Sequence, residues 1–252
     1  MKRSRTEASN SLARSIAELA STIALYLFVT TSVVQGNVIP TPSMEPTLLV
    51  GDHVLVDRTV FAPKENSVLG RLLPYREIER GDVIVFRYPL DESELYVKRA
   101  TAVPGDRVRI SDGRLYVNGS EVDEPYKVHR FQDRNLYGRD FPPARIPAGL
   151  PERGARMLRG HVSDGELIVP DGMYFALGDN RDNSADSRYW GFVPRDSIVG
   201  SPSYVYWSFD APSEQWLDRF TATHLVDLAL NLPWKTRWSR MLQPVPSARS
   251  RN

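Results

Sequence analysis

The chain begins with one long apolar segment and continues as short runs of mixed apolar and polar residues. No Asp, Glu, Lys or Arg occurs from residue 19 to residue 44, and the run LASTIALYLFVTTSVV at 19–34 is strongly apolar. A helix needs roughly 20 such residues to cross a bilayer. With the weakly polar residues up to Ile39 the segment is long enough, so the pattern predicts a transmembrane anchor over residues 16–38.

Charge on either side of this segment predicts its orientation. Basic residues outnumber acidic ones ahead of it, with Lys2, Arg3, Arg5 and Arg14 against Glu7 and Glu18. The positive-inside rule then keeps residues 1–15 in the cytoplasm and puts the rest of the chain outside. A cleaved signal peptide is the alternative, because a basic region, an apolar run and small residues such as Gly36 are all present.

After residue 39 the pattern is typical of β structure. Short runs rich in Val, Ile, Tyr and Phe are separated by turn residues, which predicts strands. The predicted strands are residues 53–56, 83–86, 95–102, 108–110, 114–117, 166–169, 173–177 and 198–207. The dipeptides Asp112-Gly113 and Asn118-Gly119 favour tight hairpin turns that need positive φ. The fold is therefore predicted to be mainly β, with antiparallel sheets.

Two stretches depart from this pattern. Residues 125–165 are rich in Pro, Arg and Gly and lack alternation, which predicts an excursion inserted between core strands at 39–124 and 166–210. In the region 211–252, residues 215–232 have apolar positions at helical spacing, and aromatic and basic residues follow at 234–238. This pattern predicts a C-terminal amphipathic helix with a basic tail, which either contacts the membrane surface or packs on the domain.

Composition limits the chemistry. The chain has 252 residues, of which 41% are hydrophobic and 25% charged, as in ordinary folded domains. Its formal net charge is +1, so no global field favours nucleic acid, and we expect no nucleic-acid partner. Cysteine is absent, which excludes disulfides, thiolate metal sites and a cysteine nucleophile. Any side-chain nucleophile must then be an oxygen.

A serine and a lysine are the candidate reactive groups. Ser43 follows the predicted anchor directly, in the proline-punctuated sequence IPTPSMEPT at 39–47. Lys98 interrupts an apolar, β-branched strand pattern, and an acidic block, GDNRDNSADSR, follows at 178–188. A lysine ammonium has a reference pKa of about 10.4 and is no base near neutrality. Burial would have to destabilise it by roughly 4 kcal/mol, whereas a lysine snorkelling from an edge strand would keep its charge.

Five ordered blocks resemble one family of enzymes. They are SMEPTL at 43–48, GDHVLV at 51–56, RGDVIVF at 80–86, YVKR at 96–99 with PGD at 104–106, and the acidic block at 178–188. In this order, after an N-terminal anchor, they are similar to the conserved boxes of bacterial type I signal peptidases, also called leader peptidases. The resemblance implies a membrane-bound serine endopeptidase with an antiparallel β-sheet catalytic core, which removes signal peptides from exported preproteins at the inner membrane.

The resemblance also implies the roles of individual residues. Ser43 is the nucleophile and Lys98 the general base, and Thr41 assists the backbone N–H of Ser43 in the oxyanion hole. Ser184 orients Lys98, and the Asp186–Arg188 ion pair supports Ser184. Six apolar residues are expected to line shallow substrate pockets that accept Ala-X-Ala sequences: Ile39, Pro40, Met44, Leu48, Tyr96 and Val97.

Other interpretations of the sequence remain open. Asp179, Asp182 and Asp186 could suggest calcium, but the spacing and glycine of an EF-hand are missing, so we expect no metal or other cofactor. The four histidines lie in scattered contexts, which makes a Ser-His-Asp triad an unfavourable hypothesis. Self-cleaving Ser/Lys repressors would need a DNA-binding domain where this chain has its apolar segment. A secreted or anchored β-rich binding module and an inactive scaffold are the remaining alternatives.

Overall fold

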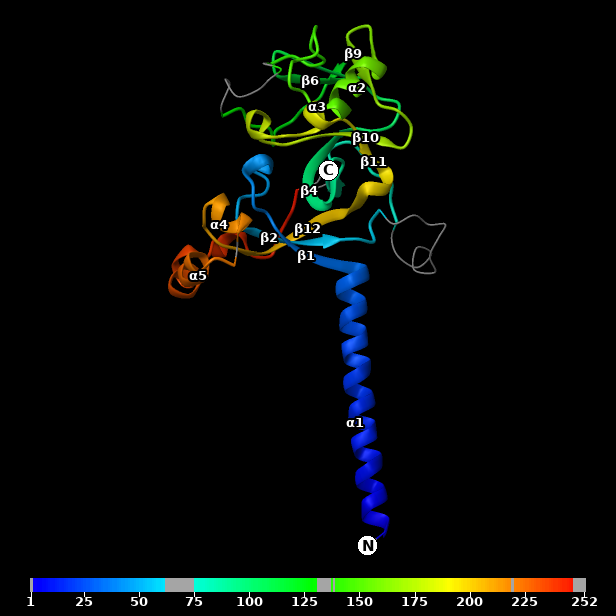
Figure 1. Ribbon diagram of the computed structural model, residues 1–252, viewed down its shortest axis with the longest axis vertical. Coiled ribbons are helices and arrows are strands. Elements are labelled where there is room, and N and C mark those ends of the chain that lie inside the picture. Colours follow the sequence, from blue (N-terminus) through cyan, green and yellow to red (C-terminus); the bar gives the residue numbers. More distant parts are fainter. Residues whose placement is uncertain (1, 62–74, 131–136, 138, 219, 247–252) are drawn as a thin grey trace.

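Two antiparallel sheets make up the body of the protein, and one long helix projects from it (Figure 1). The computed structural model describes residues 2–61, 75–130, 137, 139–218 and 220–246, without the side chains of residues 2–13, 31 and 32. The helices are α1 (Lys2–Phe28), α2 (Glu152–His161), α3 (Ser187–Trp190), α4 (Ser213–Leu217) and α5 (Ala222–Lys235). The small sheet and α2 lie at the end of the body remote from α1 (Figure 1).

The larger sheet carries the segments that the sequence marks as reactive. It has the order β1-β2-β12-β3-β4-β10-β11, and β13 pairs with β12. Its strands are β1 (Val34–Val38), β2 (Asp52–Asp57), β3 (Val83–Tyr88), β4 (Asp91–Ala102), β10 (Met173–Leu177), β11 (Val193–Pro194), β12 (Ile198–Ser208) and β13 (Gln243–Pro244). The smaller sheet has the order β7-β6-β5-β9-β8. Its strands are β5 (Arg107–Ser111), β6 (Arg114–Val117), β7 (Ser120–Glu121), β8 (Val162–Ser163) and β9 (Glu166–Ile168).

The strand predictions are confirmed. Seven of the eight predicted runs lie wholly in a strand, and five of those strands extend beyond the predicted ends. The eighth run, predicted at 166–169, is one residue too long, because β9 ends at Ile168. Both predicted turns also have the expected backbone, since φ is 49° and 74° at Asp112 and Gly113 and 53° and 80° at Asn118 and Gly119. Positive φ at both central positions lets a two-residue turn follow the right-handed twist of the strands it joins.

The N-terminal prediction needs correction. Helix α1 ends at Phe28, a π-helical turn follows at Val29–Val33, and Val34–Val38 is a strand that pairs antiparallel with β2. The last part of the predicted anchor is therefore sheet, because its backbone groups find partners in β2. In the part of the chain with described coordinates, no helix has the length and apolarity required to cross a bilayer.

The two irregular regions contain helices. Within 125–165, the residues Glu152–His161 form α2, which buries Met157 and Leu158 against the small sheet. Apolar and polar residues do not alternate along α2, because side chains return to the same face of a helix every 3.6 residues and to the same face of a strand every two. The predicted C-terminal helix is two helices, α4 and α5, with α5 starting at an N-cap where the Thr221 hydroxyl accepts from the His224 N–H at 3.3 Å.

Candidate active site

Ser43 lies on a short 3-10 turn between β1 and β2. The turn, Pro42–Met44, is followed by a hydrogen bond from the Leu48 N–H to the Met44 carbonyl at 3.0 Å. Met44 and Leu48 are fully buried in an apolar cluster that includes Ile39. These contacts anchor both sides of the serine, so Ser43 is presented on a packed segment and not on a free loop.

Lys98 reaches Ser43 from β4. Its Nζ lies 2.8 Å from the Ser43 Oγ and 3.0 Å from the Val97 carbonyl. The lysine side chain is buried, with 4% of its residue surface exposed, and it pairs with Ile84 in the β3–β4 register. The two residues are 55 positions apart in the chain, and the sheet brings them into hydrogen-bond distance.

Burial lowers the pKa of Lys98 from 10.5 to about 8. Loss of hydration is the largest cause, and the carboxylates of Asp186 and Asp179 act in the opposite direction. A substantial fraction of the amine is then neutral under mildly alkaline conditions. A neutral amine at hydrogen-bond distance from a hydroxyl can take its proton, so the pair has both the geometry and the protonation state of a nucleophile with its base.

The acidic block holds the backbone around Ser43. The Asn180 N–H donates to the Ser43 carbonyl at 3.1 Å, and the Asn180 side-chain amide donates to the Pro42 carbonyl at 3.2 Å. The carbonyl groups of Pro42 and Ser43 are therefore both hydrogen-bonded to the loop that contains Asn180. The orientation of Ser43 depends on this loop as well as on its own 3-10 turn.

Ser184 lies close to the dyad without a bond to it. Its Oγ is buried and has no hydrogen-bond partner among the described residues. A Cβ at Gly178 would lie 2.3 Å from this Oγ and 2.5 Å from the Ser43 carbonyl oxygen, so only glycine fits between the two serines. The predicted hydrogen bond from Ser184 to Lys98 is not formed in this structure. Ser184 nevertheless lies close to the backbone of Ser43, with only Gly178 between them.

Asp186 and Arg188 form the predicted ion pair. Asp186 accepts from the Arg188 Nε and Nη2, both at 2.8 Å, and from the Gly178 N–H at 3.1 Å. Both side chains are buried. The Arg188 Nη2 also donates to the Arg181 carbonyl at 2.6 Å, so the pair fastens both ends of the loop.

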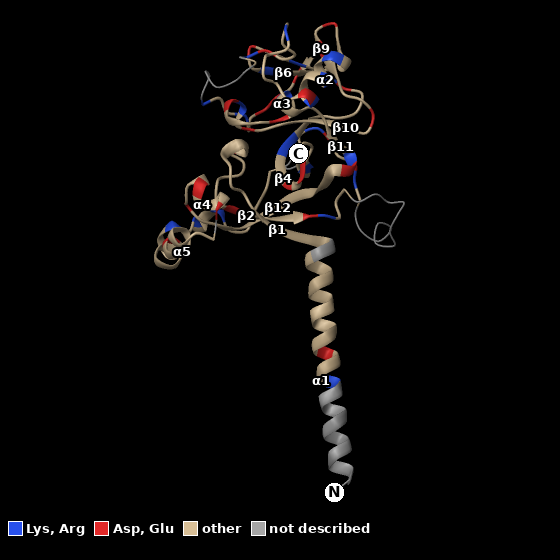
Figure 2. Ribbon diagram, viewed as in Figure 1, with Lys and Arg blue, Asp and Glu red and all other residues tan. Residues whose placement is uncertain are grey.

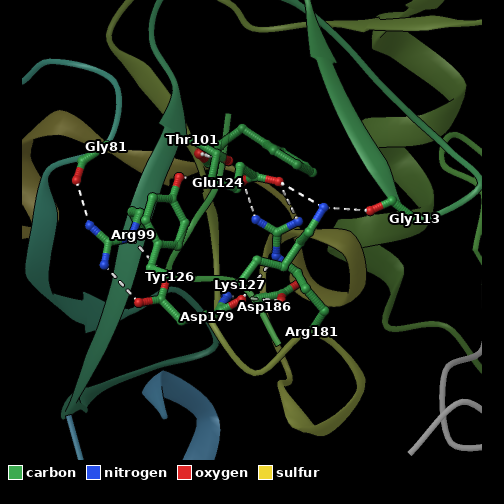
Figure 3. Close-up of polar contacts among 12 residues, drawn as sticks. Gly81, Arg99, Thr101, Gly113, Glu124, Tyr126, Lys127, Asp179, Arg181 and Asp186 are labelled. Atoms are coloured by element: carbon green, nitrogen blue, oxygen red, sulfur yellow. Dashed lines mark hydrogen bonds and ion pairs between the residues drawn. The ribbon is translucent and has the colours of Figure 1, made fainter. Parts of the chain in front are cut away.

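A second network connects the loop to the small sheet, and the sequence did not predict it. Arg99 pairs with Asp179 through two bonds of 2.8 and 2.7 Å, and its guanidinium lies 3.8 Å from the centre of the Tyr126 ring (Figure 3). Arg181 pairs with Glu124 in the same region, with both side chains buried. A lone glutamate after a short strand carries no sequence signal, because its partner lies 57 residues away.

The acidic side chains of the block have separate partners. Asp179 binds Arg99, Asp182 lies 2.9 Å from the His129 Nδ1, and Asp186 binds Arg188. In the described regions no cluster of three or more His, Asp or Glu side chains is arranged to hold a metal ion. The carboxylates of this loop therefore act in pairs that join it to its surroundings.

A cavity of about 560 Å³ opens over the dyad. Ser43 and Lys98 line it with Thr41 and with five of the six predicted pocket residues, namely Ile39, Pro40, Met44, Tyr96 and Val97. Leu48 does not line it, and that prediction was wrong: it is fully buried in the core beneath Met44. The sequence did not predict the remaining lining residues, which include Glu94, Asn183, Ala185 and Leu217.

Comparison with known proteins gives a consistent result. The family model for signal peptidase, peptidase S26, matches residues 12–207. Signal peptidase I of Pseudomonas fluorescens is 38% identical over 200 residues, which cover 75% of this chain and 70% of that protein. Signal peptidase I of Aquifex aeolicus is 32% identical over 263 residues, covering 91% and 98%.

A solved signal peptidase I from Enterococcus faecalis V583 has 33% sequence identity with this chain. It covers 50% of this chain and 97% of its own, with a TM-score of 0.36. The assignment rests on the sequence matches, which extend over the dyad and the acidic block. The chain belongs to the signal peptidase family, peptidase S26.

Proposed function

We propose that this protein cleaves signal peptides from exported preproteins by a Ser43–Lys98 mechanism. The observation that carries the proposal is the 2.8 Å contact between the Lys98 Nζ and the Ser43 Oγ inside a buried site. Neutral Lys98 takes the hydroxyl proton as the Ser43 oxygen attacks the scissile carbonyl carbon. The resulting intermediate breaks its C–N bond, and the Lys98 ammonium returns the proton to the leaving amine.

Hydrolysis of the acyl-enzyme repeats this chemistry with water. Lys98 takes a proton from the attacking water, whose oxygen bonds to the acyl carbon, and the Ser43 oxygen leaves with a proton from the lysine. The Ser43 N–H and the Thr41 hydroxyl donate to the oxyanion in both halves. Support comes from the position of Thr41, which lines the same cavity two residues before the nucleophile.

Three residues of the acidic block act as positioning residues. Ser184 orients the Lys98 amine once its hydroxyl rotates toward it, and the Asp186–Arg188 pair keeps the loop in place. The unpartnered, buried Ser184 Oγ supports this role, since a buried hydroxyl without a partner costs free energy that a bond to the amine would recover.

Substrate selection follows from the shape of the cavity. The substrate backbone adds as a strand against residues 37–41 and residues 94–98, which both line the cavity. Apolar walls from Ile39, Met44 and Val97 leave shallow space for small side chains. Large side chains are rejected sterically, which gives the Ala-X-Ala preference.

The protein acts at the outer face of the bacterial inner membrane, with its N-terminus inside and the apolar part of α1, which ends at Phe28, as the attachment. Large apolar side chains of α1, such as Ile16, Leu19, Leu25 and Tyr26, are exposed. Beyond Glu18 the described part of α1 has no charged side chain (Figure 2). Alkaline carbonate extraction tests the attachment: retention in the membrane supports it, and release counts against it.

Cleavage of a preprotein with an Ala-X-Ala site tests the proposed function. We expect the wild type to cut, and Ser43→Ala and Lys98→Ala to lose at least about 10³-fold in kcat while remaining folded. Thr59→Ala, remote from the cavity, serves as the control and should keep full activity. Cleavage by either dyad variant would contradict the proposed Ser43–Lys98 mechanism. An inactive wild type would favour a membrane-associated binding module.

A further inference from the structure

One wall of the catalytic cavity comes from beyond the region that defines the family. The family match ends at residue 207, whereas Leu217, the last residue of α4, lines the same cavity as Ser43 and Lys98. Leu217 is large and apolar, and 68% of its surface is exposed. A large, exposed apolar side chain that lines a binding cavity is available to contact an apolar part of a bound substrate.

The position of Leu217 is fixed by its neighbour. Trp216 is 5% exposed, and its ring centroid lies 5.0 Å from that of His53 and 4.6 Å from that of His224. Trp216 packs with Phe209 and Val38, the last residue of β1. Helix α4 is therefore held against the segment that leads to the nucleophile, and Leu217 is presented by a packed element.

The chemistry around Leu217 favours an apolar occupant. The cavity walls are mostly aliphatic or aromatic, with Ile39, Tyr96 and Val97 among them. Lys98 is the one cationic side chain that lines the cavity within the described residues, and its amine is already bonded to Ser43. A substrate side chain that covers Leu217 would remove apolar surface from water on both partners.

We infer that Leu217 is a specificity-determining residue, which binds an apolar side chain of the preprotein close to the scissile bond. The inference rests on the proposed function and extends it, because it gives helix α4, which lies beyond the family match, a direct contact with substrate. Side chains of an extended peptide alternate in direction, so Leu217 meets one substrate position and not its two neighbours.

Kinetics with matched variants test this contact. In detergent, Leu217→Ala should raise KM for the preprotein about fivefold with little change in kcat, because it removes binding shared by ground and transition states. Leu242→Ala is the control, since Leu242 is 74% exposed and does not line the cavity. Replacing the apolar substrate residue by Ala should raise KM for the wild type and add nothing in Leu217→Ala. Equal effects of the two leucine substitutions would overturn the inference.

Cross-linking gives an independent readout. The chain has no cysteine, so Leu217→Cys introduces a unique thiol. On a Ser43→Ala background, which retains uncut substrate, this thiol should form a disulfide with a preprotein bearing one cysteine at successive positions near the cut. Excess unlabelled preprotein should suppress the cross-link, and Leu242→Cys should give none.

The two tests separate the inference from the proposed function. Normal cleavage by the wild type, with no cross-link at residue 217 or with equal cross-links at 217 and 242, removes Leu217 from the substrate site and leaves the Ser/Lys mechanism intact. Failure of the wild type to cleave any preprotein would instead remove the function on which the inference depends.

Discussion

A single buried amine is central to the chemistry proposed for this site. Lys98 is buried on β4 beside β3, and loss of hydration is the main cause of its low pKa. The same burial weakens the fold, because a charged lysine must be desolvated whenever it is protonated. Activity and stability therefore place opposite demands on this residue.

Lys98→Met should stabilise the protein while abolishing cleavage. The pKa of Lys98 falls from 10.5 to about 8, which at 1.36 kcal/mol per unit corresponds to about 3 kcal/mol of destabilisation. The folded-state pKa is the lower one, so this cost is complete below pH 8 and disappears as pH rises to 10.5. Urea unfolding at pH 7 and at pH 9.5 should show the larger gain at pH 7, and a gain independent of pH would contradict the explanation.

The pH dependence of cleavage should follow the same amine. Lys98 acts only when neutral, so kcat/KM should rise with pH through about 8. The Asp186 carboxylate raises the pKa of Lys98, so Asp186→Asn should shift this rising limb of the pH profile of kcat/KM to lower pH. Asp182→Asn serves as the control, because Asp182 pairs with His129 instead. A limb that stays in place in Asp186→Asn would show that Asp186 does not act on Lys98.

Among the elements, the loop 178–188 depends on contacts with the small sheet. Glu124 follows β7 and is buried against Arg181, and the nearby Val128 forms a parallel bridge with Asn180. Asn180 in turn binds the Ser43 carbonyl. The segment that follows β7 thus contributes to the position of Ser43, although neither Glu124 nor Val128 lines the cavity.

Breaking the Glu124–Arg181 pair should destabilise the fold. Glu124→Met leaves the Arg181 guanidinium buried without its carboxylate, which costs about 3–5 kcal/mol. The double variant Glu124→Met/Arg181→Met should recover much of that loss, because no unpaired charge remains. Arg159→Ala, which breaks an exposed pair with Glu152, should cost less than about 1 kcal/mol. Urea unfolding of the wild type, of these variants and of the single variant Arg181→Met gives the comparison, and additive losses in the double variant would exclude coupling.

At the scale of the whole molecule, the region after β12 exposes large apolar side chains at the surface. Trp234 is 85% exposed and Trp238 is 61% exposed, whereas Trp190 and Trp216 are buried. The basic residues between the two exposed tryptophans already have acidic partners, since Lys235 pairs with Asp227 and Arg237 with Asp210. Contact with lipid at this surface would then depend on apolar insertion more than on charge.

Vesicles of brominated phosphatidylcholine can measure this contact in the full chain. We expect quenching of Trp234 and Trp238, with little dependence on salt, because aromatic rings favour the bilayer interface. The first 38 residues contain no tryptophan, so α1 does not contribute to the signal. Trp234→Phe/Trp238→Phe should remove the quenched fraction. Unquenched fluorescence in the wild type would place this surface in water.

The sequence alone determined the strands, the turns and most of the residues that meet at the candidate site. Runs of β-branched and aromatic residues and Asp-Gly or Asn-Gly turns are local features, and the structure confirms a strand at 83–86 and a turn at 112–113. The ordered blocks around Ser43 and Lys98 carried the family assignment. These signals are readable because each lies within a few consecutive residues.

Only the tertiary structure decided which groups meet. Strand pairing ends the N-terminal helix before residue 34, packing buries Leu48 beneath the site, and α4 brings Leu217 to the cavity. The Glu124–Arg181 pair likewise joins residues that are far apart in the chain. Such contacts depend on how sheets pack and which backbone groups find partners, and no local pattern of residues encodes that choice.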